Sequence, residues 1–178
     1  MSTNIRNQPM YIQSGSFEGE NVLAATDPYP GMIGGRATVN VKGVGGKTYQ
    51  RVLTDSSMAV APFQGAVAFW SDKTRYMVTT TVGTLGRGRP AGIFQNAIVP
   101  GNIGYIQVEG RGNVFFIDTP TAAPTAAGLI VVPSATAGKA DALAAGSAAT
   151  YPSLGVTAGT VIGGTGQAPV DILVPETP

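Results

Sequence analysis

Short apolar runs, punctuated by Gly and Pro, are the feature that most limits what this chain can fold into. Val, Ile and Thr together make up 48 of the 178 residues, whereas Leu contributes only 7. Side chains branched at Cβ fit the pleated surface of a sheet better than the surface of a helix. The 25 Gly and 13 Pro favour frequent turns between such segments. The sequence therefore predicts an all-β protein, a sandwich or a barrel of short strands.

Two segments have the pattern of β-hairpins. Residues 37–54 alternate apolar and polar side chains around a Gly-rich turn at 43–46. Residues 57–82 contain two apolar runs, which a polar turn at 71–74 separates. Further short strands are predicted as far as residue 118, with turns at 100–102 and at 110–113.

The C-terminal part combines strands with stretches of small residues. An Ala-rich run between Gly138 and Gly146 favours the one short helix that we expect, over residues 138–147. The last strand alternates strictly, which places its Val and Ile side chains on one face and Asp171 on the other.

These patterns divide the chain into three parts. Residues 1–35, rich in Pro and Gly, are predicted to form an extended N-terminal arm. Residues 36–118 form a β-unit with hairpins, and residues 119–178 form a C-terminal β-unit that completes the barrel; alternatively, 36–178 is one domain. The arm is either a loose terminus or a segment that lies on a neighbouring subunit. In the second case its large side chains would contact the partner: Tyr11, Ile12, Phe17 and Tyr29.

The charge content indicates a protein that associates with others. Only 12% of the residues are charged and the net charge is +1, and such a surface tends to associate. The dense basic face of a nucleic-acid-binding domain is missing, so we expect no nucleic-acid partner. The N-terminus lacks the apolar segment of a signal peptide, and no stretch has the roughly 20 strongly apolar residues of a membrane span.

The residue inventory excludes several kinds of chemistry. Without His and Cys the chain cannot form disulfides, Cys/His zinc sites, thiol nucleophiles or His-based triads. The GVGGKT segment at 43–48 lacks the first Gly of a phosphate-binding P-loop and precedes a strand-like run. Glu18 and Glu20 lie in the expected arm, where no rigid scaffold holds them as a catalytic pair. We therefore expect no enzyme activity, no catalytic residue, no cofactor and no metal site.

Three further side chains are candidates for contacts with a partner. Arg87 and Arg89, in the Gly-rich loop 83–92, could contact an acidic surface. Phe115 and Phe116 are adjacent in a predicted strand, so one of them should point away from its own core, and we assign Phe116 to the interface.

The residues GIFQNAIVPGNIGYIQVEGRG (92–112), LGV (154–156) and APVDILV (168–174), with the small-residue stretch 126–143 between them, resemble the head decoration, or cement, proteins of tailed bacteriophages. The resemblance covers about half of the chain. It implies a small antiparallel β-barrel or β-tulip-like body on the outer capsid surface, assembled in the host cytoplasm as part of the virion. Such proteins often bind as trimers and bridge neighbouring subunits of the major capsid protein, which stabilises the capsid.

Two other functions remain open from the sequence. The chain could be another structural part of a virion, either the base of a head fibre or a tail component. It could also be a carbohydrate-binding β domain, which would require an exposed aromatic platform around Trp70. A β core needs large aromatic side chains as well, so the aromatic residues alone do not separate these functions.

Overall fold

The computed structural model describes residues 33–41, 45–82, 89–116, 124–162 and 166–175. These residues form ten strands and contain no helix, which confirms the prediction of an all-β fold. The strands, in chain order, are β1 (Arg36–Val41), β2 (Gly45–Thr54), β3 (Val67–Asp72), β4 (Met77–Thr79), β5 (Pro90–Phe94), β6 (Ile103–Phe115), β7 (Ile130–Pro133), β8 (Ala140–Ala142), β9 (Gly155–Thr157) and β10 (Gln167–Leu173).

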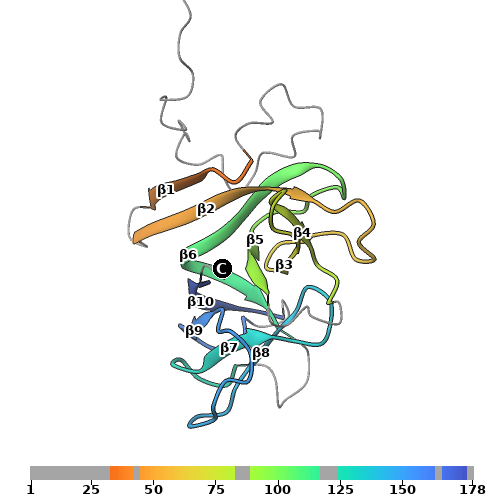
Figure 1. Cartoon of the computed structure of the whole chain (residues 1–178). Coiled ribbons are helices and arrows are strands. Elements are labelled where there is room, and N and C mark those ends of the chain that lie inside the picture. Colours follow the sequence, from red (N-terminus) through yellow and green to blue (C-terminus); the bar gives the residue numbers. More distant parts are fainter. Residues whose placement is uncertain (1–32, 42–44, 83–88, 117–123, 163–165, 176–178) are drawn as a thin grey trace, which may run out of the picture.

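All ten strands belong to one sheet, and part of this sheet curls into a ring (Figure 1). In the ring β2 pairs with β4, β4 with β3, β3 with β5 and β5 with β6, and β6 pairs again with β2. The pairing of β2 with β4 is parallel, and the other four ring pairings are antiparallel. The sheet continues beyond the ring through β10, β9, β7 and β8, in that order.

The long strand β6 joins the ring to this extension, as the green ribbon between the orange and blue strands shows (Figure 1). Its residues 103–109 pair with β2, and its residues 109–115 pair with β10. The predicted turn at 110–113 is therefore wrong, because the strand runs through it. Gly110 has a φ of 92°, and a Cβ at this position would overlap the carbonyl oxygen of Gly46. Glycine lets β6 lie against β2 at the point where it changes partner.

The ring encloses a hydrophobic core to which each of its five strands contributes. Fully buried members of this ring core are Val52, Val78, Ala68, Phe94 and Ile106, from β2, β4, β3, β5 and β6 respectively. The alternation of side chains along each strand explains why one face of every ring strand is apolar.

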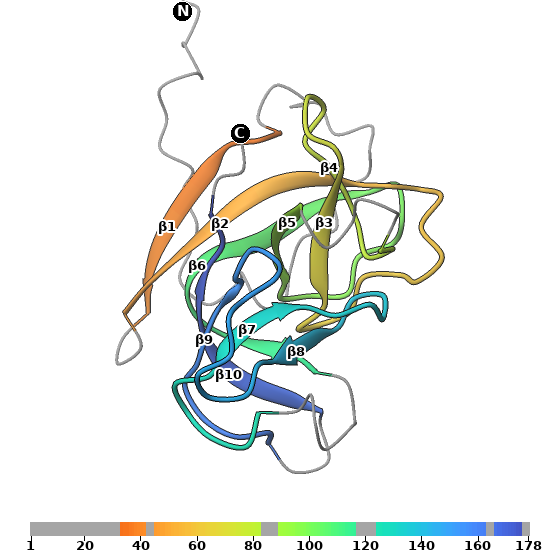
Figure 2. The ribbon, with the colours of Figure 1, turned by 60° about the horizontal axis from the view of Figure 1, so that its bottom comes forward.

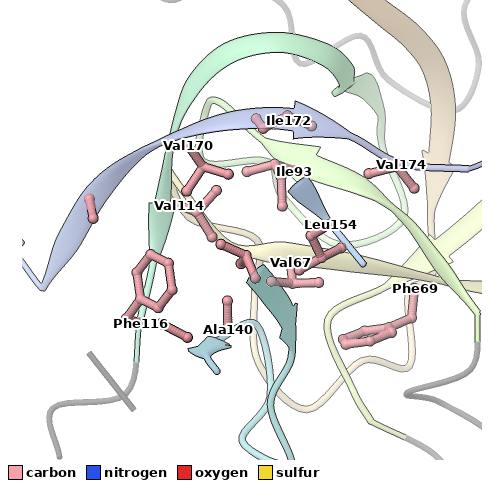
Figure 3. Packing of buried hydrophobic residues seen from close by; sticks show 13 residues of the cluster. Val67, Phe69, Ile93, Val114, Phe116, Ala140, Leu154, Val170, Ile172 and Val174 are labelled. Atoms are coloured by element: carbon pink, nitrogen blue, oxygen red, sulfur yellow. The ribbon is translucent and has the colours of Figure 1, made fainter. Parts of the chain in front are cut away.

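A second core lies between the ring and the C-terminal strands, which lie below the ring in both views (Figures 1 and 2). Its members come from both parts of the chain and include Val67, Ile93, Val114, Leu154 and Val170 (Figure 3). Since Val67 belongs to this second core and Ala68 to the ring core, β3 is buried on both faces. Burial on both faces accounts for the uninterrupted apolar sequence at the start of β3, from Val67 to Trp70. The second core crosses the boundary predicted between residues 118 and 119.

Both predicted hairpins are present. β1 and β2 pair antiparallel around the turn predicted at 43–46, of which residues 45 and 46 begin β2. β3 and β4 pair antiparallel around a turn at residues 73–76, two residues later than the polar turn predicted at 71–74. The first apolar run of this second hairpin is shorter as a strand than its sequence suggested, since it is extended only from Val67 to Asp72.

The short helix predicted over residues 138–147 is absent. Residues 140–142 form β8, which pairs antiparallel with β7. Ala140 and Ala142 are buried, and Asp141 between them is half-buried. The helix preference of alanine is below about 1 kcal/mol per residue, so strand pairing and the burial of alternate side chains outweigh it.

The predicted N-terminal arm falls mostly on residues 1–32, which lie outside the described residues. The last residues of that segment, Gly34 and Gly35, exchange backbone hydrogen bonds with Arg51 of β2 at 2.7 and 2.9 Å. The chain therefore joins the sheet before β1 begins.

Candidate functional site

An exposed sheet face extends across β1, β2, β6, β10 and β9, and we define it by seven residues. These are Thr38, Thr48, Glu109, Leu173, Arg111, Asp171 and Val156. The strand register places the first four opposite one another in a row across four strands. Side-chain hydrogen bonds link this row: the hydroxyls of Thr38 and Thr48 are 3.0 Å apart, and the Thr48 hydroxyl donates to Glu109 Oε2 at 3.1 Å.

A second row of the exposed sheet face combines an ion pair with an apolar side chain. The guanidinium of Arg111 donates to both carboxylate oxygens of Asp171, from Nε at 2.9 Å and from Nη2 at 3.1 Å. Val156 of β9 lies opposite Asp171 and is 42% exposed, while Leu173, two residues along β10, is 65% exposed. Exposed apolar side chains beside a geometrically fixed ion pair are a composition suited to contact with another protein.

The hydrogen bond from Arg111 holds the pKa of Asp171 below its ordinary value of 3.8. A carboxyl group with a lowered pKa in the folded state contributes stability above its unfolded pKa, and this contribution is lost as the pH falls through the folded pKa. We expect the replacement Asp171→Asn to lower the melting temperature slightly at neutral pH, since the pair is exposed, and to lose this effect in acid, below the lowered pKa of Asp171. Thermal melts of both proteins across this range measure the difference. A difference that persists in strong acid would contradict the electrostatic origin.

A pocket of about 310 Å³ opens where β1, β2, β3, the β3–β4 turn and β5 meet. We call it the ring pocket. Its polar and aromatic lining consists of Arg36, Gln50, Trp70, Lys73 and Tyr76, and the rest of the lining is Gly34, Ala91, Val174 and Pro175. The rings of Trp70 and Tyr76 meet edge to face, with centroids 6.2 Å apart and planes inclined by 68°. Gln50 is buried; its Oε1 accepts from Arg36 Nη2 at 3.5 Å and its Nε2 donates to the Gly34 carbonyl at 3.4 Å.

Most of the interface residues predicted from the sequence lie outside the described residues: Tyr11, Ile12, Phe17, Tyr29 and Arg87. Glu18 and Glu20 lie outside them as well. Arg89 is described and exposed, and its carbonyl accepts a hydrogen bond from the Trp70 backbone at 3.1 Å. Arg89 is thus available to a partner, whereas its backbone is part of the sheet.

The assignment of Phe116 to an interface is wrong for the surface of this chain. Phe116 is 1% exposed and belongs to the second core, where Figure 3 shows it beside Ala140. Its neighbour Phe115 is the half-exposed member of the pair, and its ring meets Phe63 edge to face at 5.3 Å. One of the two rings does point away from the second core, as alternation required, but the sequence did not say which.

The described residues contain neither a metal-binding cluster nor a membrane-spanning helix. Within them, no group of three or more His, Cys, Asp or Glu side chains comes together in a way that could hold a metal ion. No helix in this part of the chain is long and apolar enough to cross a membrane.

Sequence reasoning found one member of the exposed sheet face and missed the others. The alternation of residues 168–174 predicted that Asp171 points away from the core, and the structure confirms this. Its partner Arg111 falls where a turn was predicted, and the ring pocket joins residues far apart in the sequence. The sequence matches no protein-family model, and a search of curated proteins finds no match.

Proposed function

We propose that this chain is a structural protein of a bacteriophage virion, which binds the outer surface of the assembled capsid and bridges neighbouring subunits of the major capsid protein. The observation that carries the proposal is the exposed sheet face, with Leu173 65% exposed and Val156 42% exposed beside a bidentate ion pair. The sequence resemblance to phage head decoration proteins supports the same function.

The sheet beneath this face suits a protein that holds neighbouring subunits together. β6 and β10 are paired with strands on both sides, so their exposed side chains project from a hydrogen-bonded scaffold. A preformed surface loses little conformational entropy when it binds. Affinity then comes from area and fit, and the function requires no chemical step.

Decoration stabilises a capsid by mass action. A protein that binds the assembled shell, and not the separated subunits, shifts the equilibrium toward the shell. Repetition by symmetry, including the proposed homotrimer, lets individually weak contacts sum to strong attachment.

The test is co-sedimentation of the purified full chain with expanded, undecorated heads of its phage. We expect the protein to pellet with expanded heads and to remain in the supernatant with unexpanded ones, which present different subunit contacts. A protein that ignores expanded heads contradicts the proposal. Sites spread over the whole shell in a particle reconstruction distinguish decoration from the base of a head fibre or a tail component, and sedimentation equilibrium tests the trimer.

We expect the replacement Leu173→Lys to weaken binding to expanded heads at least tenfold, because it places a charge where the exposed sheet face has its most exposed apolar side chain. Its effect on stability should stay within about 0.5 kcal/mol, since the side chain is exposed. Val99→Lys is the matched control: Val99 is 62% exposed, on the loop before β6, and gains the same charge.

Binding isotherms from sedimentation measure both variants. The assignment of this face fails if Leu173→Lys binds heads as well as Val99→Lys does. The capsid proposal itself fails only if the unmodified protein does not bind.

A further inference from the structure

The ring pocket has the position and size of a small-molecule site. The mouths of β-barrels are among the places where ligand pockets occur most often, and such pockets begin at roughly 300 Å³. At about 310 Å³ the ring pocket suits a ligand the size of one sugar ring. It does not include the seven residues of the exposed sheet face, so an inference about it goes beyond the proposed capsid function.

The turn that carries two of the lining residues is held in one conformation. Asp72 Oδ1 accepts hydrogen bonds from the Thr74 backbone at 3.0 Å, from the Thr74 hydroxyl at 2.7 Å and from the Arg75 backbone at 3.3 Å. The Tyr76 amide donates to the Lys73 carbonyl at 3.2 Å, and its carbonyl accepts from Leu53 of β2 at 3.0 Å. Lys73 and Tyr76 are therefore placed before any ligand arrives.

Tyr76 keeps a backbone conformation that its residue type disfavours. Its φ is 50°, and no other described residue except glycine has a positive φ. Such a conformation is unfavourable for a residue with a side chain and is concentrated at functional sites. Here it turns the ring toward Trp70 and against Gly34, where a Cβ would lie 2.7 Å from Tyr76 Cδ2.

The pocket is cationic as well as aromatic. Arg36 and Lys73 line it, and none of its described lining residues is acidic. The nearest carboxylate in sequence, Asp72, faces the backbone of its own turn. Among the described residues, the lining therefore offers an anionic ligand two cations and no carboxylate.

We propose that the ring pocket binds an acidic sugar, a pyranose ring that carries a carboxylate. The guanidinium of Arg36 and the ammonium of Lys73 bind the carboxylate, and the apolar face of the sugar packs in the corner between Trp70 and Tyr76. The two rings meet at an angle, and one side of Tyr76 is covered by Gly34, so they do not form the parallel stack that favours a nucleobase.

The chain offers a direct reporter, since Trp70 is its only tryptophan. We expect glucuronate, added to the full chain, to change the tryptophan fluorescence with a Kd on the order of 1 mM. N-acetylneuraminate should act in the same way, and neutral glucose should bind about tenfold more weakly, because it lacks the charge-assisted hydrogen bonds.

Lys73→Gln removes one cation from an exposed position and should weaken glucuronate binding about threefold, because Arg36 still contacts the carboxylate, without affecting glucose. Arg75→Gln is the matched control, because Arg75 carries the same charge on the same turn and does not line the pocket. Tyr76→Asn keeps a residue that tolerates a positive φ and should abolish binding of both sugars while the protein stays folded.

The proposal is overturned if glucuronate and glucose give equal affinities, if neither changes the fluorescence, or if Lys73→Gln and Arg75→Gln behave alike. Adenosine monophosphate that binds more tightly than glucuronate also overturns it, in favour of a nucleotide site. Head binding by the same preparations is measured separately, so that failure of this site and failure of the capsid function are distinguished.

Discussion

Replacing Gly110 by alanine is expected to lower the free energy of unfolding by about 3–5 kcal/mol. Two costs combine at this position. The φ of 92° is strained for any residue with a side chain, and the new Cβ would overlap the Gly46 carbonyl oxygen and lie 2.9 Å from Lys47 Cα. Both contacts are with the backbone of β2. The overlap can be relieved only if β6 moves away from β2, and the pairing of these two strands closes the ring.

Gly45→Ala separates the two costs. Gly45 has a φ of 97°, nearly that of Gly110, but nothing lies within 4 Å of a Cβ there. We expect a loss of only about 1–2 kcal/mol, which is the conformational strain alone. Denaturant unfolding of both variants measures the difference. Equal losses would show that the approach of β6 to β2 does not depend on glycine at position 110.

Phe116→Ala should also be strongly destabilising, by about 3–5 kcal/mol. The Phe116 side chain is 1% exposed and packs in the second core, where it joins β6 to the C-terminal strands. Its removal leaves a cavity that a sheet held by backbone hydrogen bonds cannot close fully.

Phe115→Ala provides the comparison, since it removes the same side chain one residue earlier. Phe115 is half-exposed, and its ring contacts Phe63 and lies 5.1 Å from the Lys139 ammonium. We expect a loss of about 1–2 kcal/mol. Calorimetric or denaturant unfolding of both variants shows which replacement lowers the free energy of unfolding more. If Phe115→Ala costs more than Phe116→Ala, the orientation of the two rings described here is incorrect.

The correct predictions concern features that follow from residue composition and from the alternation of side chains along a strand. The β-branched residues and the Gly punctuation indicated an all-β fold, and the hairpin over 37–54 and the outward direction of Asp171 followed from side chains alternating in short segments. These are local properties. Each can be evaluated without knowing which other strand lies alongside.

The incorrect predictions concern segments whose conformation depends on residues far away in the sequence. The segment 110–113 has the composition of a turn, but its four residues pair with β10, directly after the residues of β6 that pair with β2, and this pairing keeps the segment extended. The segment 138–147 has the composition of a helix, but its residues 140–142 pair with β7 and form a strand. Phe115 and Phe116 are equivalent in sequence, and only the position of the second core distinguishes them. The ring pocket was missed for the same reason, since Gly34, Trp70 and Val174 meet only once the sheet has curled.

The burial of β3 on both faces has a consequence for how this protein unfolds. Neither the ring nor the C-terminal strands can keep a complete interior without the other, because Val67 and Ile93 of the ring are covered by β10 and its neighbours. Loosening one part would expose apolar area on the other and draw it into the same transition. The protein should therefore unfold in one cooperative transition, with few partly unfolded forms between the folded and unfolded states.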